Sequence, residues 1–321
     1  KRRLHGLARR TWLYFEHFIG PEDNWLPPDN VQLDPNPVTA HRTSPTNIGL
    51  MLLSTLGAYN LGYLGVVELS LRLQNTLEVL ARLERYRGHL LNWYDTRSLE
   101  PLNPRYVSTV DSGNMIGSFM ALRQGCLWLL DQPLDPAAHL GGLCDSLEVL
   151  EQVLAEAMLE GAELTAKAAA VRARVERDEG KRERWAALVT YLRDEAWAEL
   201  QQGLVAAIDS GDLSGADLAA ARLWAERVHH GIRVTLGEFD SLAPWVGALA
   251  EAGDWANGLA ADSPAGAAWH DVKVAFSTDP SLRSLEEWSA AAAVRLRAFR
   301  DAAGDKGEER QKWTEALEAR L

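Results

Sequence analysis

The sequence predicts an all-α protein. Apolar residues recur at helical spacing, as at Leu69, Leu73 and Leu77, and no long run alternates apolar with polar residues as a half-buried strand does. Proline-rich stretches at 21–42 and 131–136 separate the helical segments, since proline removes a backbone donor and fixes φ. With 321 residues, of which 47% are hydrophobic, the chain can bury a sizeable core.

The first elements follow from local signals. Helical spacing over 4–19 predicts a helix, and the proline-rich stretch 21–42 predicts an extended but structured loop. Ser44 is an N-cap residue that precedes a proline at the first helical position, which predicts a helix over 45–60. The uncharged stretch 43–67 is long enough to resemble a membrane span, but asparagines and glycines interrupt it. We therefore interpret it as a buried helix, a turn and the start of a second helix.

Further helices are predicted along the rest of the chain. Gly65 opens one that ends near Gly88, and after a loop over 89–108 another covers about 111–130. The second half is rich in Ala, Leu, Glu and Arg, with heptad-like runs such as LEVLEQVLAEAMLEGAEL. Its helix starts are expected at Ser214 and Ser281. This composition predicts long amphipathic helices packed as hairpins.

Composition excludes several classes of function. The net charge of −12 argues against a nucleic-acid partner, which would need a basic stripe. Cys126 and Cys144 provide neither a disulfide framework nor metal-ligand spacing, which favours a reducing compartment. No secretory signal is visible in the opening KRRLHGLARR. We expect no metal and no cofactor.

Two polar clusters lie in the segment HLLNWYDTRSLEPLNPRYVSTVDSGN, residues 89–114. An aromatic ring can cover the apolar face of a sugar, while carboxylate, amide and guanidinium groups bond to its hydroxyls. This chemistry is offered by Trp93, Tyr94, Asp95, Arg97, Asp111 and Asn114.

A purely structural interpretation stays open for the same residues. Trp93 and Tyr94 are equally explained as packing a loop against the core, and Asp95 with Arg97 as a local ion pair. Asp111 is equally explained as the N-cap of the following helix. Among the remaining polar residues, Arg42 to Ser44 fit a helix cap, His41 and His89 are isolated, and the adjacent His229 and His230 point apart on a helix. No pair of carboxylates stands out by spacing as an acid/base couple.

Four stretches resemble the cyclic β-1,2-glucan synthases of bacteria: NWLPPDN (24–30), AHRTSPTNIGLMLLST (40–55), RLERYRGHLLNWYDTR (82–97) and EPLNPRYVSTVDSGN (100–114). The strong part covers about residues 10–130, within the region between that family's glycosyltransferase and phosphorylase-like domains. The resemblance implies a glycoamylase-like (α/α) barrel that closes a linear β-1,2-glucan into a ring, with retention at the anomeric carbon. On this interpretation, 1–136 hold the first helices and sugar-site loops of the barrel, and 137–321 form a helical insertion or coiled-coil-like bundle.

The resemblance also implies a set of glucan-binding residues in the loops 40–47 and 89–110 and the helix that follows. They are Arg42, Thr43, Asn47, Trp93, Tyr94, Asp95, Arg97, Asp111, Ser112 and Asn114. Retaining glycoside chemistry needs two carboxylates roughly 5–5.5 Å apart. The catalytic acid and nucleophile match no residue here and are expected beyond the C-terminal end, so we expect this chain to be a fragment that is inactive alone.

The expected partners are the β-1,2-glucan chain and the other domains of the same parent protein. The parent would be membrane-bound, and this region would lie on the cytoplasmic face of the bacterial inner membrane, with KRRLHGLARR as a basic flank. The alternative is a helical scaffold that spaces the synthase and phosphorylase-like domains and has no chemistry of its own. A complete hydrolase is a third possibility, motivated only by the barrel analogy.

Overall fold

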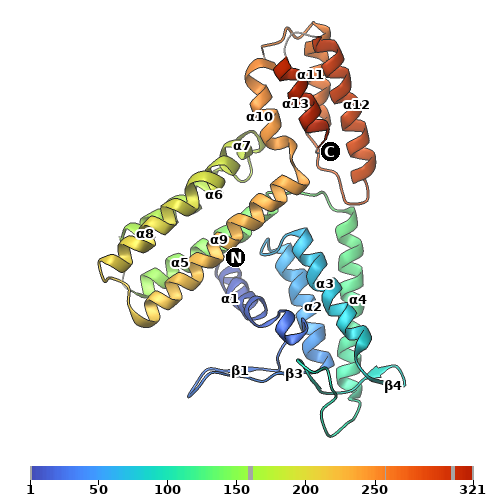
Figure 1. Ribbon diagram of the computed structural model, residues 1–321, viewed down its shortest axis with the longest axis vertical. Helices are drawn as coiled ribbons and strands as arrows, with labels where there is room; N and C mark the ends of the chain where they lie inside the picture. Colours follow the sequence, from blue (N-terminus) through green and yellow to red (C-terminus); the bar gives the residue numbers. More distant parts are fainter. Residues whose placement is uncertain (1, 158–161, 257, 305–307, 320–321) are drawn as a thin grey trace.

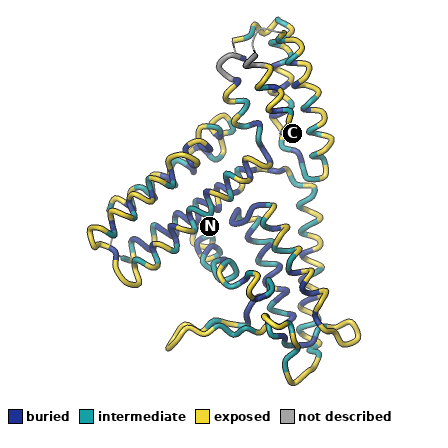
Figure 2. The backbone as a smooth tube through the Cα atoms, viewed as in Figure 1, coloured by how far each residue is buried: buried dark blue, intermediate teal, exposed yellow. Residues whose placement is uncertain are grey.

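The computed structural model of the protein describes residues 2–157, 162–256, 258–304 and 308–319. It is 71% helical, which confirms the predicted all-α class. The helices form three groups that differ in direction and position (Figure 1). Figure 2 shows that buried residues face the interior of each group and exposed residues lie along the outer helix faces.

The first group carries the loops of interest. It contains α1 (Arg2–Phe18), α2 (Pro45–Asn60), α3 (Val66–Arg82) and α4 (Thr109–Asp131). Helix α2 packs along α4 and also contacts α3 and α1. The Ser44 hydroxyl accepts the Asn47 N–H at 3.2 Å, which confirms the predicted cap. A core cluster that includes Ile48, Leu52 and Leu122 joins these helices.

Short two-residue strands pin the loops of the first group. They are β1 (Val31–Gln32), β2 (Val38–Thr39), β3 (Arg42–Thr43), β4 (Arg85–Tyr86), β5 (His89–Leu90) and β6 (Tyr94–Asp95), beside a 3₁₀ turn η1 (Pro21–Asp23). The pairs β1–β2, β3–β6 and β4–β5 are all antiparallel. The β1–β2 arm projects from the body of the molecule, and so does the β4–β5 hairpin (Figure 1).

The second group is a layered set of long helices. It contains α5 (Ala138–Glu156), α6 (Glu163–Asp178), α7 (Arg182–Tyr191), a π-helical turn η2 (Leu192–Ala196), α8 (Trp197–Asp209) and α9 (Gly215–Leu242). Helix α5 packs against α9 on one side and α6 on the other, and α8 packs on α6. Leucines of α5, among them Leu143, Leu147 and Leu150, are fully buried between these neighbours.

The third group lies at the far end of α7 and α9 (Figure 1). It contains α10 (Trp245–Ala256), α11 (Pro264–Ala275), α12 (Leu285–Ala303) and α13 (Glu308–Glu318). Aromatic side chains fill its interior, with the Trp269 and Phe299 ring centroids 5.3 Å apart. Two contacts connect it to the rest of the molecule. Arg182 donates to both carboxylate oxygens of Asp279 at 2.7 and 2.9 Å, and the Leu134 N–H donates to the Pro280 carbonyl.

Three predicted boundaries were wrong. The helix expected to reach Gly88 ends at Arg82, because a hairpin with Arg87 and Gly88 at positive φ occupies 85–90. The helix expected at Ser281 begins at Leu285, after a turn in which Ser281 and Ser284 bond to each other. The N-cap of α4 is Ser108, whose hydroxyl accepts the Asp111 N–H at 3.1 Å, so Asp111 is not the cap.

Polar side chains are buried where α1 meets the second group. The Arg9 side chain donates to the Ser146 hydroxyl at 2.9 Å and to the Glu16 carboxylate at 3.1 Å. Its guanidinium lies 5.3 Å from the Tyr63 ring centroid and 5.4 Å from that of Trp224. One side chain therefore joins α1 to the helices behind it.

None of the helices in the described residues combines the length and apolarity that crossing a bilayer needs.

The turn after α2 meets α5 at a pair of glycines. A Cβ at Gly142 would overlap the carbonyl of Gly62, which itself has φ +76°. The neighbouring Gly141 is exposed on α5, and a Cβ added there would meet no other group within 4 Å. The close approach explains why a glycine is needed at 142 and not at 141.

We therefore expect opposite effects from two adjacent substitutions. Gly142→Ala should lower the free energy of unfolding by about 1–3 kcal/mol through overpacking. Gly141→Ala should raise it by about 0.5–1 kcal/mol, because alanine loses less backbone entropy in a helix. Denaturant unfolding of both variants provides the measurement, and equal effects would contradict the packing described here.

A buried carboxylate joins the first and second groups at the start of α3. Glu238 is 3% exposed and accepts the Val66 N–H at 2.9 Å, while His139 donates to the Leu64 carbonyl at 2.7 Å. Burial raises the pKa of Glu238 from 4.5 to about 7, although the Val66 N–H acts in the opposite sense. The folded protein therefore favours the protonated form.

Stability should depend on pH through this residue. The contribution of a raised carboxyl pKa is fully present below pH 4.5 and is lost as the pH rises through about 7. Glu238→Gln should match the wild-type free energy of unfolding near pH 4 and exceed it at pH 8 by an amount on the order of 2 kcal/mol. The exposed Glu287→Gln serves as control, and a parallel pH dependence in both variants would argue against the assignment.

Candidate functional site

Strand pairing brings the two predicted loops together. In the β3–β6 pair, Arg42 lies opposite Asp95 and Thr43 opposite Tyr94. The Thr96 N–H also donates to the His41 carbonyl at 3.0 Å, which extends the pairing by one step. The loop before α2 and the loop before α4 therefore form one continuous surface next to the N-terminal ends of both helices.

Asn92 connects Trp93 to Asp111. When the side-chain amide is oriented so that both its oxygen and its nitrogen have hydrogen-bond partners, the nitrogen donates to Asp111 Oδ2 at 3.0 Å. Its oxygen accepts from Trp93 Nε1 and from the Tyr106 hydroxyl, both at 2.8 Å. The Asn92 N–H also donates to the Tyr106 carbonyl at 2.9 Å, and the residue is 6% exposed. The indole and the carboxylate thus lie on the same side of the molecule, held by one amide.

Arg42 lies over the same indole. Its guanidinium carbon is 4.9 Å from the Trp93 ring centroid, within the range of a cation–π contact. Two of its nitrogens donate to Asp29 Oδ2 at 3.1 and 2.9 Å, and Asn47 donates to the other oxygen of Asp29 at 3.3 Å. Asp29 therefore orients both Arg42 and Asn47, a role that its sequence context did not predict.

A second guanidinium, that of Arg97, is connected through His41 to the buried carboxylate of Asp23. Asp23 accepts from His41 Nδ1 at 2.8 Å and from the Thr96 hydroxyl at 2.5 Å. Arg97 Nη2 then donates to His41 Nε2 at 2.9 Å. In the tautomer in which Nε2 accepts from Arg97, Nδ1 donates to Asp23. His41, interpreted from sequence as isolated, is in fact part of a chain of hydrogen bonds beneath Arg97.

Asp95 stabilises the turn that carries Arg97. Its Oδ1 accepts the N–H groups of Ser98 at 2.8 Å and of Arg97 at 2.9 Å. These hydrogen bonds, that of Ser98 foremost, lower the pKa of Asp95 against a smaller opposing effect of burial. Asp95 is thus a charged acceptor at neutral pH and not a proton donor. The predicted Asp95–Arg97 ion pair is replaced by these backbone bonds.

Four predicted residues lie elsewhere around this surface. Thr43 and Tyr94 are fully buried, and the Tyr94 hydroxyl donates to the Glu84 carbonyl and accepts the Leu91 N–H, both at 2.6 Å. They support the loops from beneath and have no surface for a ligand, which corrects the prediction for both. Asn114 is exposed and donates to the Thr46 hydroxyl at 3.1 Å. Ser112 faces a neighbouring cavity.

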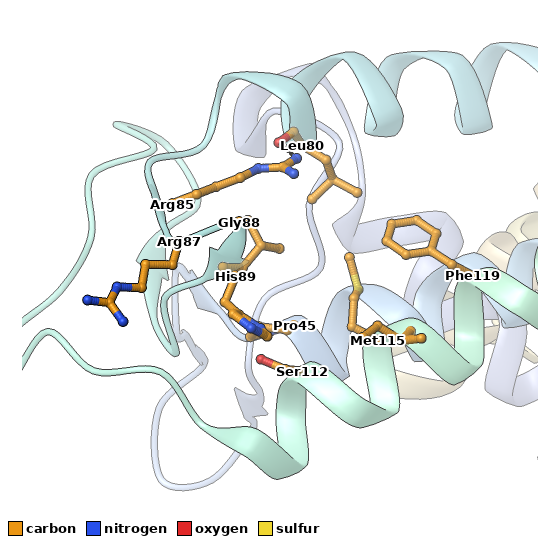
Figure 3. A pocket seen from close by; sticks show the side chains of 11 residues that line it. Pro45, Leu80, Arg85, Arg87, Gly88, His89, Ser112, Met115 and Phe119 are labelled. Carbon is orange, nitrogen blue, oxygen red and sulfur yellow. Dashed lines mark hydrogen bonds between the residues drawn. The ribbon is translucent and has the colours of Figure 1, made fainter.

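That cavity has a volume of about 330 Å³ and lies between α4 and the β4–β5 hairpin (Figure 3). His89 and Ser112 stand near Pro45 on one side, and Met115 and Phe119 line the other. It adjoins the surface around Asp111, since Asp111 and Ser112 are consecutive on α4. We call the surface formed by Arg42, Asn47, Trp93, Arg97 and Asp111 the polar platform.

The polar platform offers an aromatic ring, a carboxylate, an amide and two guanidinium groups. These groups have the chemistry that suits a polyhydroxylated ligand, since hydroxyls both donate and accept hydrogen bonds. The missed contributors, namely Asp23, Asp29, Asn92 and Tyr106, act through distant pairings that local spacing does not reveal. Among the described residues, no group of three or more His, Cys, Asp or Glu side chains has the geometry of a metal site.

Comparison with known proteins gives one strong similarity. No family model matches the chain. A segment of 157 residues is 48% identical to the cyclic beta-(1,2)-glucan synthase NdvB of Rhizobium meliloti (strain 1021). The segment covers 49% of this chain and 5% of that relative. The chain therefore spans a small part of the length of the protein it matches.

The resemblance expected from the sequence is thereby confirmed: about half of this chain is similar to a segment of a cyclic β-(1,2)-glucan synthase.

Proposed function

We propose that this chain contributes to the glucan-cyclising transglycosylase region of a cyclic β-1,2-glucan synthase. In this proposal α1–α4 are the first helices of an (α/α) barrel, and the polar platform binds the glucan chain. The parent protein would be membrane-bound, with this region on the cytoplasmic face of the bacterial inner membrane. The similarity to NdvB supports the substrate class, because that protein is named for cyclic β-(1,2)-glucan.

The convergence of Trp93 and Asp111 on Asn92 is the observation that carries the proposal. A glucose ring stacked on the indole would place its hydroxyls beside groups that are already oriented. Arg42 and Asn47 are held by Asp29, and Arg97 by His41 and Asp23. Because these side chains are held by hydrogen bonds within the protein, little conformational entropy would be lost on binding a sugar. Thr43 and Tyr94 act only by shaping the loops.

The platform supplies binding groups and not a complete catalytic apparatus. Retaining chemistry requires a protonated acid beside a nucleophile about 5–5.5 Å away. Asp95 is held in its charged form by the Ser98 and Arg97 N–H groups, so it does not fill the acid's role. The proposal therefore assigns glucan positioning to these loops and leaves the acid and nucleophile unassigned.

A structural role for the second half is favoured by a separate observation. The helices α5–α13 enclose a core cluster of their own, which extends from Leu140 to Leu317. This supports the second candidate function, in which the region spaces the synthase and phosphorylase-like domains of the parent. The two functions are compatible, because they concern different halves of the chain.

Binding measurements test the first function directly. Trp93→Ala should weaken binding of linear β-1,2-glucan about tenfold or more, since an aromatic stacking surface is lost. Asp111→Asn should weaken it several-fold by removing a charged acceptor. Isothermal titration calorimetry provides the measurement, and the exposed Trp128→Ala on α4 serves as the matched control. Unchanged affinity in both platform variants would leave only the scaffold function.

Asn92 is proposed as a positioning residue for both groups. Asn92→Asp would set two carboxyl groups side by side, and one proton would be shared between them. We expect glucan affinity to fall at pH 7 and to recover as the pH is lowered toward about 5, where the pair gains that proton. The wild-type protein should show no such recovery. A loss of affinity that is independent of pH would point to misfolding of the loop instead.

A further inference from the structure

The cavity beside the polar platform differs from it in chemistry. Its walls are mostly apolar, with Leu80, Met115 and Phe119 on one side and Pro45 beside His89 (Figure 3). Apart from Ser112, its polar lining residues are basic: Arg85, Arg87 and His89. None of the eleven residues that line it is acidic, although the chain as a whole has a net charge of −12.

The basic groups are not neutralised by acidic neighbours. In the part of the chain that the structure describes, no ion pair joins Arg85, Arg87 or His89 to a carboxylate. The nearest acidic residue in sequence, Glu84, is engaged by Arg105 at 3.0 Å. The Arg85 guanidinium donates to the Leu80 carbonyl at 3.0 Å, which holds it across the top of the cavity. Arg87 extends outward from the rim.

A backbone turn brings these basic residues to one side of the cavity. Arg87 and Gly88 both have positive φ, and they reverse the chain between β4 and β5. This tight turn sets Arg85 and His89 on adjoining strands, with Tyr86 opposite His89 in the ladder. The hairpin therefore places basic residues on one side of the cavity. The apolar residues of α3 and α4 that line the other side are called its floor below.

Such a cavity does not suit a glucan. A neutral polyol needs acceptors as well as donors, and the floor offers only the Ser112 hydroxyl among its side chains. A buried apolar wall instead favours a ligand with a hydrocarbon part, while guanidinium groups that have no carboxylate partner favour phosphate or carboxylate. The volume of about 330 Å³ falls at the lower end of small-molecule sites.

We propose that the cavity between α4 and the β4–β5 hairpin binds a small amphiphilic anion, with an aliphatic chain against Leu80, Met115 and Phe119 and an anionic head on Arg85, Arg87 and His89. This site is separate from the polar platform and does not rest on the proposed glucan function. Two sources could supply this combination of anionic head and aliphatic chain. One is a free amphiphile, and the other is a bilayer lipid that contributes its headgroup and the first segment of its chain.

Titration with alkyl phosphates tests both parts of the ligand. We expect affinity to rise about fourfold per methylene from butyl to hexyl phosphate, since each buried CH₂ adds a transfer term, and to level off once the floor is covered. Inorganic phosphate and octyl glucoside, which lack the tail and the charge respectively, should each bind at least tenfold more weakly than octyl phosphate. Equal binding of octyl glucoside would overturn the proposal.

Variants locate the site. Arg85→Gln and Arg87→Gln together should weaken octyl phosphate binding at least tenfold and leave glucan affinity unchanged, because neither residue belongs to the polar platform. The exposed Arg123→Gln on α4 is the charge-matched control and should bind as the wild type does. Undiminished binding in the double variant would overturn the assignment.

Vesicle flotation distinguishes the two sources of the ligand. Co-flotation of the protein with phosphatidylglycerol vesicles would identify a bilayer lipid, whereas binding of octyl phosphate without flotation would identify a free amphiphile.

Discussion

The arrangement of the helices depends on a buried guanidinium, that of Arg9. It is 2% exposed, and it bonds to Ser146 on α5 and to Glu16 on its own helix. Glu16 is also paired with Arg227 of α9 at 3.1 Å. Removing such charges from water costs several kcal/mol each, so the cluster is favourable only when all partners are present. α1 can therefore dock in one register against α5 and α9, and this register sets where the loops after α1 begin.

The candidate site itself is formed mainly by the loops that follow α1. The short β3–β6 pair aligns the segment before α2 with the segment before α4. Tyr94 anchors the same region from beneath, since its buried hydroxyl bridges two backbone groups. The platform side chains then need only local partners, such as Asp29 for Arg42 and His41 for Arg97. A helical frame thus carries a polar surface whose side chains are held by partners within the protein.

Much of the fold could be predicted from the sequence, and the reasons are local. Helix α2 begins where Ser44 and the following proline predict, because capping involves neighbours within three residues. The β4–β5 hairpin was missed because leucine spacing continued the preceding helix, whereas Arg87 at positive φ is not a residue that signals a turn. The chemistry of Tyr94 predicts a binding residue, but its burial involves a contact with Glu84 that no short pattern encodes. The roles of Asp29 and Asn92 could not be predicted for the same reason, because Asp29 bonds to Arg42 and Asn92 to Tyr106 and Asp111, which local spacing does not reveal.

The shared amide of Asn92 has a consequence for how this surface can vary. Because one side chain sets the orientation of both the indole at 93 and the carboxylate at 111, the energetic effects of changes at these two positions are not independent. A double-mutant cycle between them would report a coupling energy that passes through the amide and not through direct contact. Divergence at one position therefore restricts the side chains tolerated at the other, and related sequences should change these three residues as a set.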